Sequence, residues 1–135
     1  MNEPMRLAWR AALLPLLVGS AAAGENAPAP ANAVVAADGS GQYRTVQEAI
    51  NAAPQLCQVG PRWVIQVKPG TYRELIYVQR EKRFVSLVGE DPAKTVITYD
   101  LYASLPGQDG KPIGTFRTPT ALIDADDFTV ENITF

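Results

Sequence analysis

The sequence predicts an all-β fold built from short strands. From residue 63 onward, apolar residues recur at every second position, as in Trp63, Ile65 and Val67, and turn-forming or charged residues bound each run. No helix-length segment separates the runs, which argues against a doubly wound α/β sheet. Several runs have apolar residues at both odd and even positions, and no Asn-Gly turn joins neighbouring runs. A sandwich, a barrel and a solenoid all stay open, and the last two observations favour stacked parallel strands.

Residues 1–23 have the pattern of a secretory signal peptide. Arg6 and Arg10 make the start positive, an apolar core follows, and small residues provide a cleavage site after Ala23. The apolar core is far shorter than the about 20 residues that span a bilayer. We therefore expect a secreted or periplasmic protein. Residues 24–33 (GENAPAPANA) are rich in Ala and Pro and predict a flexible linker, so the folded part should start near Val34.

The first folded elements are a strand and a helix. Residues 34–37 are apolar, and the glycines of residues 38–41 (DGSG) permit a tight turn after them. A helix is predicted over residues 46–53, because Thr45 and Glu48 form a capping box and apolar residues follow at helical spacing. The apolar face of so short a helix must cover other apolar residues.

The remaining elements are strands, because the apolar periodicity changes to two after the helix. A Pro69-Gly70 turn is expected between the first two of them. The predicted strands are residues 63–68, 75–78, 84–88, 95–99, 121–123 and 128–135.

Composition excludes several kinds of site. The chain has 12 Lys and Arg against 14 Asp and Glu, a formal net charge of -2, which gives no indication of nucleic-acid binding. It contains no His, so a Ser-His-Asp triad, a Cys-His pair and a His-based zinc site are excluded within these residues. The single cysteine, Cys57, cannot form an intramolecular disulfide, and without a neighbouring base we expect it to be a small packing residue.

A series of motifs resembles the pectin methylesterase (pectinesterase) family. Residues 38–50 (DGSGQYRTVQEAI) are similar to the family's opening motif, and residues 67–74 (VKPGTYRE) to its G-x-Y-x-E signature. Residues 87–97 then resemble the L-x-G-(E/D) and T-x-I steps, and residues 114–135 resemble the segment that closes a rung. Each motif is weak alone, but their order and intervals over residues 34–135 make the resemblance specific.

The resemblance implies a right-handed, single-stranded parallel β-helix of the pectin-lyase type, in which rungs of roughly 20 to 30 residues cover one another. The helix at residues 46–53 would cap its N-terminal end, and the Gly- and Pro-rich residues 102–114 would protrude as a side loop. The implied reaction is hydrolysis of galacturonate methyl esters in pectin. The family uses an Asp nucleophile, a second Asp as acid and base, Gln oxyanion donors and an Arg, with no cofactor or metal.

Few of the family's functional positions can be carried over. No stretch here is similar to the catalytic motifs, so we expect no catalytic residue in this chain, a β-helix that is incomplete at its C-terminal end, and no activity from the chain alone. Thr120 is similar to a substrate-contacting residue, and Tyr72 and Glu74 of the signature are interpreted as structural. The implied partner is pectin (methyl-esterified homogalacturonan). No nucleic-acid or membrane partner is expected, and the open C-terminal end would favour self-association.

The sequence also contains an acidic and a basic cluster, and two functions other than ester hydrolysis stay open. The Asp residues of 124–127 match no EF-hand spacing and favour a solvated turn over a calcium or catalytic site. The basic residues of 73–83 could meet pectate carboxylates, but a charged turn is preferred. A non-catalytic β-helix module that binds cell-wall polysaccharide is an alternative function. A third possible function is that of a pectate lyase or polygalacturonase, but the G-x-Y-x-E motif and the helix motif argue against it.

Overall fold

The computed structural model describes residues 30–55 and 59–135. The predicted signal peptide, Cys57 and most of the predicted linker lie outside these residues. The first strand begins at Ala33, whose side chain is buried, so the last residue of the predicted linker belongs to the fold. Just before it, the Asn32 amide donates to the Val64 carbonyl at 2.8 Å, which ties the entry of the chain to the neighbouring strand.

The described strands pair in parallel and form three sheets. The strands are β1 (Ala33–Val35), β2 (Trp63–Val67), β3 (Gly70–Arg73), β4 (Ile76–Val78), β5 (Val85–Gly89), β6 (Thr95–Thr98), β7 (Ala121–Ile123) and β8 (Thr129–Glu131). The sheets are β1-β2-β5-β8, β3-β6 and β4-β7. Two successive rungs, β2-β3-β4 and β5-β6-β7, therefore lie on top of each other, with β1 and β8 extending the first sheet on either side. This is a parallel β-helix. A sandwich and a barrel are excluded for the described residues.

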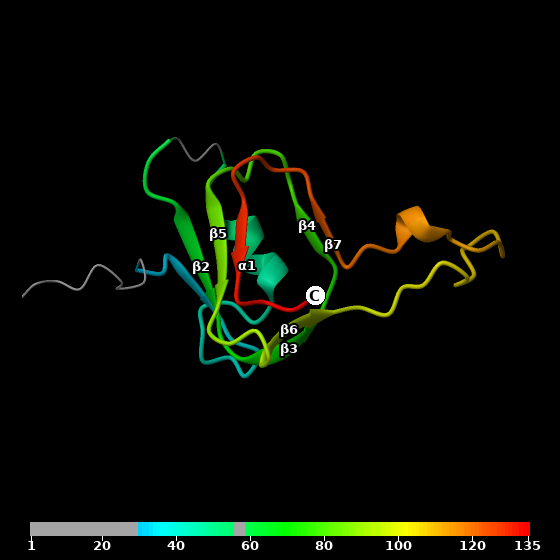
Figure 1. The fold of residues 1–135 in the computed structure, drawn as a ribbon, viewed down its shortest axis with the longest axis horizontal. Helices are drawn as coiled ribbons and strands as arrows, with labels where there is room; N and C mark the ends of the chain where they lie inside the picture. Colours follow the sequence, from blue (N-terminus) through cyan, green and yellow to red (C-terminus); the bar gives the residue numbers. More distant parts are fainter. Residues whose placement is uncertain (1–29, 56–58) are drawn as a thin grey trace, which may run out of the picture.

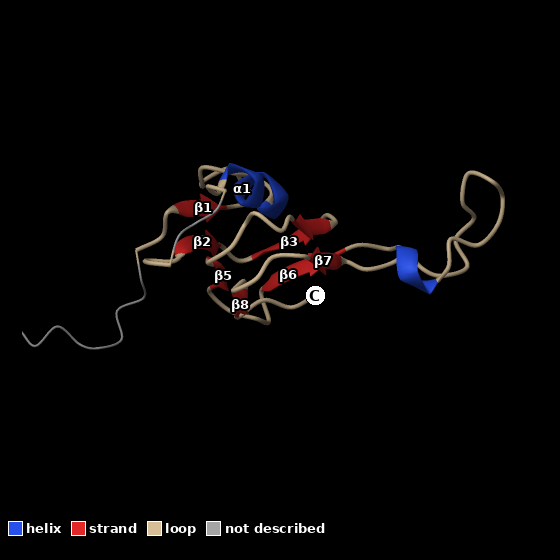
Figure 2. Ribbon diagram, turned by 90° about the horizontal axis from the view of Figure 1, so that it is seen from above, coloured by secondary structure: helices blue, strands red, loops and turns tan. Residues whose placement is uncertain are grey.

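The three sheets enclose the core as the three sides of a triangle (Figure 1), and the view from above shows the strands stacked from β1 to β8 (Figure 2). Inward-facing residues repeat from rung to rung: Ile65 lies opposite Leu87, and Tyr72 lies opposite Ile97. All four are buried. Removing these large apolar side chains from water is the main force that holds the stack together.

The helix α1 (Val46–Ala52) closes one end of the solenoid, as expected. Its residues Val46, Ala49 and Ile50 are fully buried against the first rung. The side chain of Gln47 donates to the Tyr77 carbonyl at 2.9 Å and accepts from the Tyr77 amide at 2.7 Å. These two bonds replace a neighbouring strand on the free edge of β4, and a covered edge cannot recruit another chain.

Both ends of α1 are capped, partly by residues far away in sequence. Thr45 accepts from the Glu48 amide at 3.2 Å, as the capping box predicts. Glu74 accepts from the amides of Val46 at 2.8 Å and Gln47 at 2.9 Å, so this carboxylate lies at the positive end of the helix dipole.

The other end of α1 is capped by a lysine. Lys82 donates to the carbonyls of Asn51, at 2.8 Å, and Ala53, and only 5% of the lysine is exposed. A cation at the carbonyl end of a helix is favourable, because the last carbonyls have no partner within the helix. Lys82 thus lies in the predicted turn, but its side chain is a buried cap rather than a charge in solvent.

Strand β3 was not predicted, the last predicted strand is too long, and most other strand ends differ from the prediction by one or two residues. Gly70 belongs to β3 rather than to a turn, because the rung needs only a corner at Pro69 before the chain continues extended beside β6. The last predicted strand, residues 128–135, is shortened to β8, because Asn132 adopts φ 54° and turns the chain. After that turn Thr134 bridges to Val96, so the chain begins to follow the second sheet again.

Candidate functional site

The outer face of the β4-β7 sheet carries apolar side chains in an exposed position. Strand alternation turns Ile76 and Val78 inward and Tyr77 outward. Tyr77 lies opposite Leu122 of β7, and the two residues are 44% and 55% exposed. Aromatic and aliphatic side chains held side by side on a rigid sheet can contact the apolar faces of a ligand.

Thr120, the only site residue that the sequence indicated, lies at the edge of this face. It comes directly before β7, and its carbonyl accepts from the Ile76 amide at 2.9 Å. Thr120 is half-buried in the bend before β7, two residues before Leu122, and the bond to the Ile76 amide brings it near the exposed Leu75. It therefore stands at the end of an exposed apolar strip made by Leu75, Tyr77 and Leu122. We call these four residues the β4-β7 face.

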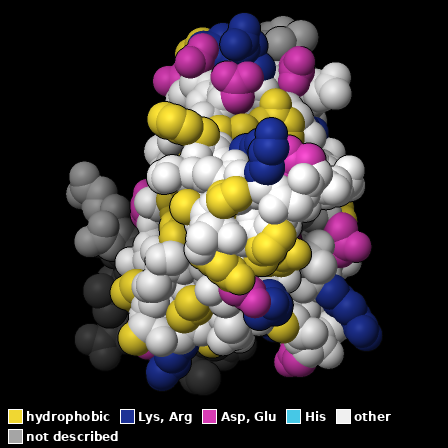
Figure 3. Space-filling view, turned by 90° about the vertical axis from the view of Figure 1, so that its right-hand side faces the viewer, with side chains coloured by type: hydrophobic (Ala, Val, Ile, Leu, Met, Phe, Trp, Pro, Cys, Tyr) yellow, Lys and Arg dark blue, Asp and Glu magenta, His cyan; other side chains and the backbone are white. Residues whose placement is uncertain are grey.

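A long arm, residues 99–120, projects beside the β4-β7 face. It leaves the chain after β6 and returns at Thr120, and it extends away from the solenoid (Figure 1, yellow to orange). Seen from the side on which the arm projects, apolar side chains spread over the middle of the surface, and charged ones lie at its upper end and along its right and lower edges (Figure 3). A ligand lying on the β4-β7 face would thus have the arm at its flank.

The acidic cluster between β7 and β8 forms surface ion pairs. Arg80 lies 3.5 Å from Asp124, and Arg83 lies 3.9 Å from Asp126 and 3.1 Å from Asp127. All five side chains are substantially exposed, so each pair contributes about 0–1 kcal/mol. Among the described residues, no three His, Cys, Asp or Glu side chains gather closely enough to hold a metal ion.

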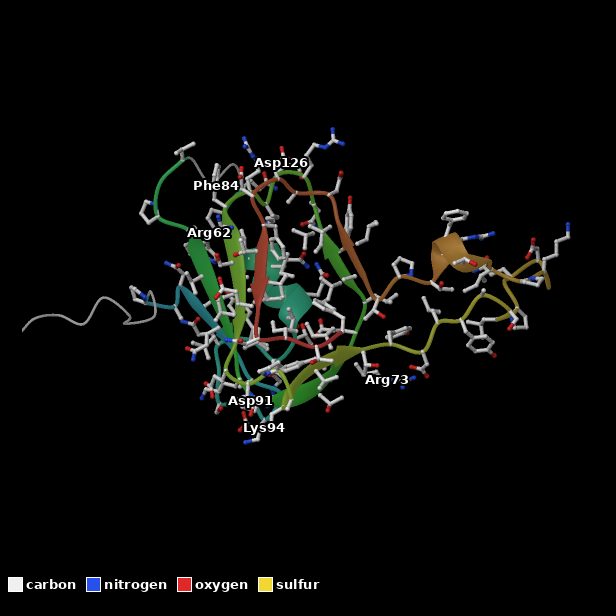
Figure 4. The ribbon with its side chains drawn as sticks, in the orientation of Figure 1. Arg62, Arg73, Phe84, Asp91, Lys94 and Asp126 are labelled. Carbon is white, nitrogen blue, oxygen red and sulfur yellow. The ribbon has the colours of Figure 1, made fainter. Side chains whose placement is uncertain are left out.

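The basic residues of 73–83 do not form one open patch. Arg73 pairs with Asp100 and lies 5.7 Å from the ring centre of Tyr99, at the base of the arm (Figure 4). Arg80 and Arg83 face the acidic turn, and Lys82 is buried under α1. The three arginines are therefore paired with aspartates, and the lysine is bound to helix carbonyls.

The G-x-Y-x-E signature acts through packing and capping. Tyr72 is buried, and its hydroxyl donates to the Lys68 carbonyl at 2.8 Å. Burial raises the pKa of Tyr72 above its usual value. A Cβ at Gly70 would touch the ring of Tyr72 at 3.4 Å, and Glu74 caps α1. These contacts agree with the structural interpretation of Tyr72 and Glu74.

The opening motif is a turn. The carboxylate of Asp38 accepts from the Ser40 amide at 2.9 Å, which lowers the pKa of Asp38. Gly39 has φ 83°, and a Cβ at Gly41 would lie 2.6 Å from the Val34 carbonyl oxygen. Glycine is needed at both positions, one for its backbone angle and one for its close approach.

A hollow on a different side of the solenoid was not predicted. It lies over the outer face of the β1-β2-β5-β8 sheet, where Arg62 donates to Ser86 at 2.6 Å and to the Val85 carbonyl at 3.1 Å. Its lining includes Asn32, Arg62, Val64, Val88, Glu90 and Glu131. The β4-β7 face lies on another sheet, so it and the hollow are separate candidates.

The sequence prediction missed most of the β4-β7 face. A signal was present, because Leu75-Ile76-Tyr77-Val78 is apolar at both parities and therefore must expose every second side chain if one face is buried. Leu122 gives the same signal between Ala121 and Ile123. The exposed residues can be assigned only once the strand pairing shows which parity faces inward.

The family model and the similar proteins all carry the same family description. Residues 32–135 match the protein-family model described as Pectinesterase. The chain is 40% identical over 114 residues to probable pectinesterase/pectinesterase inhibitor 23 of Arabidopsis thaliana, covering 84% of this chain and 19% of the relative. It is 41% identical over 104 residues to a pectinesterase of Daucus carota, covering 77% of this chain and 30% of the relative. The chain thus spans less than a third of each of these relatives.

Solved structures agree in fold. Pectin methylesterase PemA from Erwinia chrysanthemi is 31% identical with a TM-score of 0.65, covering 77% of this chain and 30% of that one. Pectin methylesterase from carrot is 30% identical with a TM-score of 0.60, covering 81% of this chain and 40% of that one. A pectin methylesterase in complex with a hexasaccharide is 31% identical with a TM-score of 0.63, covering 77% of this chain and 30% of that one. In the part of the chain that the structure describes, no helix is long and apolar enough to cross a membrane.

Proposed function

Because the chain belongs to the pectinesterase family, we propose that it forms the N-terminal rungs of a β-helix that hydrolyses galacturonate methyl esters in pectin. The observation that carries this proposal beyond the family is the β4-β7 face. Esterified galacturonate units are uncharged, and their rings have apolar faces and hydroxyl groups. An exposed strip of Leu75, Tyr77 and Leu122 with the hydroxyl of Thr120 at its edge matches that chemistry.

In this proposal the chain binds pectin and does not carry out the chemistry. Thr120 contacts the polysaccharide, and the catalytic Gln, Asp and Arg residues of the family are not among these residues, since no stretch is similar to the catalytic motifs. The chain alone should therefore bind methyl-esterified pectin and release no methanol from it.

Two assays test this proposal. The full chain is incubated with methyl-esterified pectin and methanol is measured, while binding is measured by affinity electrophoresis in gels that contain the same pectin. We expect background methanol, retardation in the gel, and weaker retardation for Thr120→Val, which removes one hydroxyl. Thr71→Val is the matched control, because Thr71 is an exposed strand threonine on the β3-β6 sheet. Methanol release above background, or equal retardation of the two variants, would contradict the proposal.

We also propose that the protein is secreted or periplasmic and that it acts on the cell wall. The support is the signal-peptide pattern of residues 1–23, together with the location of pectin outside the cytoplasm. Sequencing the N-terminus of protein recovered from the periplasm or medium should give Gly24 as the first residue. Recovery from the cytoplasm with an intact N-terminus would contradict this location.

Weak self-association is a further part of the proposal. Ile123 is 45% exposed although it occupies the same inward position as Val78, which is 0% exposed. The apolar cross-section of the last described rung, including the exposed Phe135, can be covered by a second copy of the chain. Light scattering should show a mass that rises with concentration, and Ile123→Asp should abolish the rise. A monomer at all concentrations would contradict this part.

A further inference from the structure

The arm of residues 99–120 is an ordered element with its own hydrogen bonds. The amide of Gly107 donates to the Lys111 carbonyl at 2.8 Å, and the amide of Ile113 donates to the Leu105 carbonyl at 2.9 Å. The side chains of Leu105 and Ile113 are half-buried, and Pro106 and Pro112 form an antiparallel bridge. These backbone bonds hold the two halves of the arm together. Whatever the arm presents at its surface is therefore presented in a defined place.

The arm presents an aromatic side chain and a cation next to each other. Phe116 is 99% exposed in the 3-10 helix η1 (Thr115–Arg117), the highest exposure among the large hydrophobic residues described. Arg117 follows it and is also exposed, and it forms no ion pair within the described part of the chain. Arg73, at the base of the arm, is by contrast paired with Asp100.

The arm also lies next to the β4-β7 face. It ends at Thr120, which belongs to that face, and the 3-10 helix lies only a few residues earlier (Figures 1 and 2). A polysaccharide is long and repetitive, so a chain bound at Thr120 continues past the flank where η1 lies. The contacts on the arm and on the sheet would then be made by successive units of one chain, which raises the total affinity.

We propose that Phe116 and Arg117 form a second contact for the galacturonan chain, and this inference rests on the proposed function. Phe116 packs against the apolar face of a sugar ring, whatever the state of its carboxyl group. Arg117 binds the carboxylate of a unit that has already lost its methyl ester, through parallel N–H donors that match the two oxygens. The arm thus favours chains in which de-esterified units lie beside the units bound at the sheet.

Phe116 and Arg117 should respond differently to methyl esterification of the ligand, and this difference can be measured. Binding of the full chain is measured with two probes, fully methyl-esterified homogalacturonan and polygalacturonate. Phe116→Ala should weaken binding of both probes by roughly 3- to 10-fold, and Phe116→Trp should keep it. Arg117→Gln should weaken only the binding of polygalacturonate and should reduce its dependence on salt.

Matched variants control for the loss of an exposed apolar or charged group as such. Val59→Ala truncates a side chain that is 89% exposed outside the arm, and Arg44→Gln removes an exposed arginine from the loop before α1. Neither should alter binding of either probe. All of these side chains are at the surface, so the variants should fold as the unchanged chain does.

The possible outcomes separate this inference from the proposed function. If the unchanged chain binds neither probe, the proposed pectin binding fails and the arm contact fails with it. If it binds both and the Phe116 and Arg117 variants bind equally well, only the arm contact is overturned. If Phe116→Ala leaves binding intact but abolishes self-association in light scattering, the arm is a contact for a second copy, which also overturns the inference.

Discussion

Replacing Glu74 by alanine tests whether the G-x-Y-x-E signature is structural. The Glu74 carboxylate accepts from the amides of Val46 at 2.8 Å and Gln47 at 2.9 Å, and Val46 is fully buried. Alanine leaves both amides without this partner at the start of α1. The expected result is a less stable helix and a less well covered end of the solenoid.

The size of the effect follows from these two bonds. Loss of a helix cap costs about 0.5–2 kcal/mol, and hydrogen bonds to a charged group contribute about 1.5–3 kcal/mol each when buried. Glu74 is only half-buried, so water screens part of this contribution. We expect the free energy of unfolding to fall by about 2 kcal/mol, which corresponds to a Tm lower by roughly 8–16 °C for a domain of this size.

The assay is urea unfolding of the full chain, followed by circular dichroism, with two comparison variants. Glu74→Gln keeps one carbonyl oxygen as an acceptor and should lose about half as much stability. Glu48→Ala removes another acidic side chain near the same helix end, and should cost only about 0.3–1 kcal/mol through the helix dipole. Equal losses for Glu74→Ala and Glu48→Ala would refute the capping role of Glu74.

Three further predictions concern other contacts in the stack. Gly89→Ala places a Cβ 2.2 Å from the Asn132 carbonyl oxygen and should cost about 1–3 kcal/mol in urea unfolding; an unchanged midpoint would contradict the rung spacing. Lys82→Met leaves the carbonyls of Asn51 and Ala53 without their lysine donor and should cost about 1–3 kcal/mol, whereas a gain in stability would show that burying the charge outweighs the cap. Burial raises the pKa of Tyr72, so the unfolded chain loses the phenol proton at a lower pH than the folded chain does. The free energy of unfolding should therefore fall as pH rises past 10, and Tyr72→Phe should not show this fall. Parallel curves of stability against pH for the two proteins would contradict the prediction.

The sequence predicted the elements that depend on local signals. The Thr45–Glu48 capping box and the spacing of apolar residues were enough to place α1 to within one residue. The β7 strand was placed correctly because a three-residue apolar run carries its own boundaries. Alternation also located β2 and β5, since inward residues such as Ile65 and Leu87 must be apolar in any packed sheet.

What the sequence could not predict depends on pairing between distant segments. Alternation is the same for parallel and antiparallel neighbours, so the stacking of Trp63 on Val85 needed the family resemblance or the structure. Lys82 looked like one of several surface cations, because nothing in its neighbourhood indicates that the end of α1 lies above it. The same holds for Glu74, which is 28 residues from Val46.

The candidate site was predicted only at one point. Thr120 came from the resemblance, and the local sequence around it contains no sign of a binding role. Tyr77 and Leu122 became candidates only when β4 and β7 were seen to pair, because pairing decides which parity is outside. Phe116 lies after the predicted side loop of residues 102–114, and no role was predicted for it; its exposure follows from the way the arm projects from the solenoid.

Binding of pectin to the β4-β7 face can be tested by one NMR titration. Methyl-esterified oligogalacturonate is added to the full chain while backbone amide signals are followed. Shifts should be centred on Tyr77, Thr120 and Leu122, with the signals of Gln66 and Ser86 in the separate hollow unchanged. Shifts centred on the hollow, or no shifts at all, would show that pectin does not bind at the β4-β7 face.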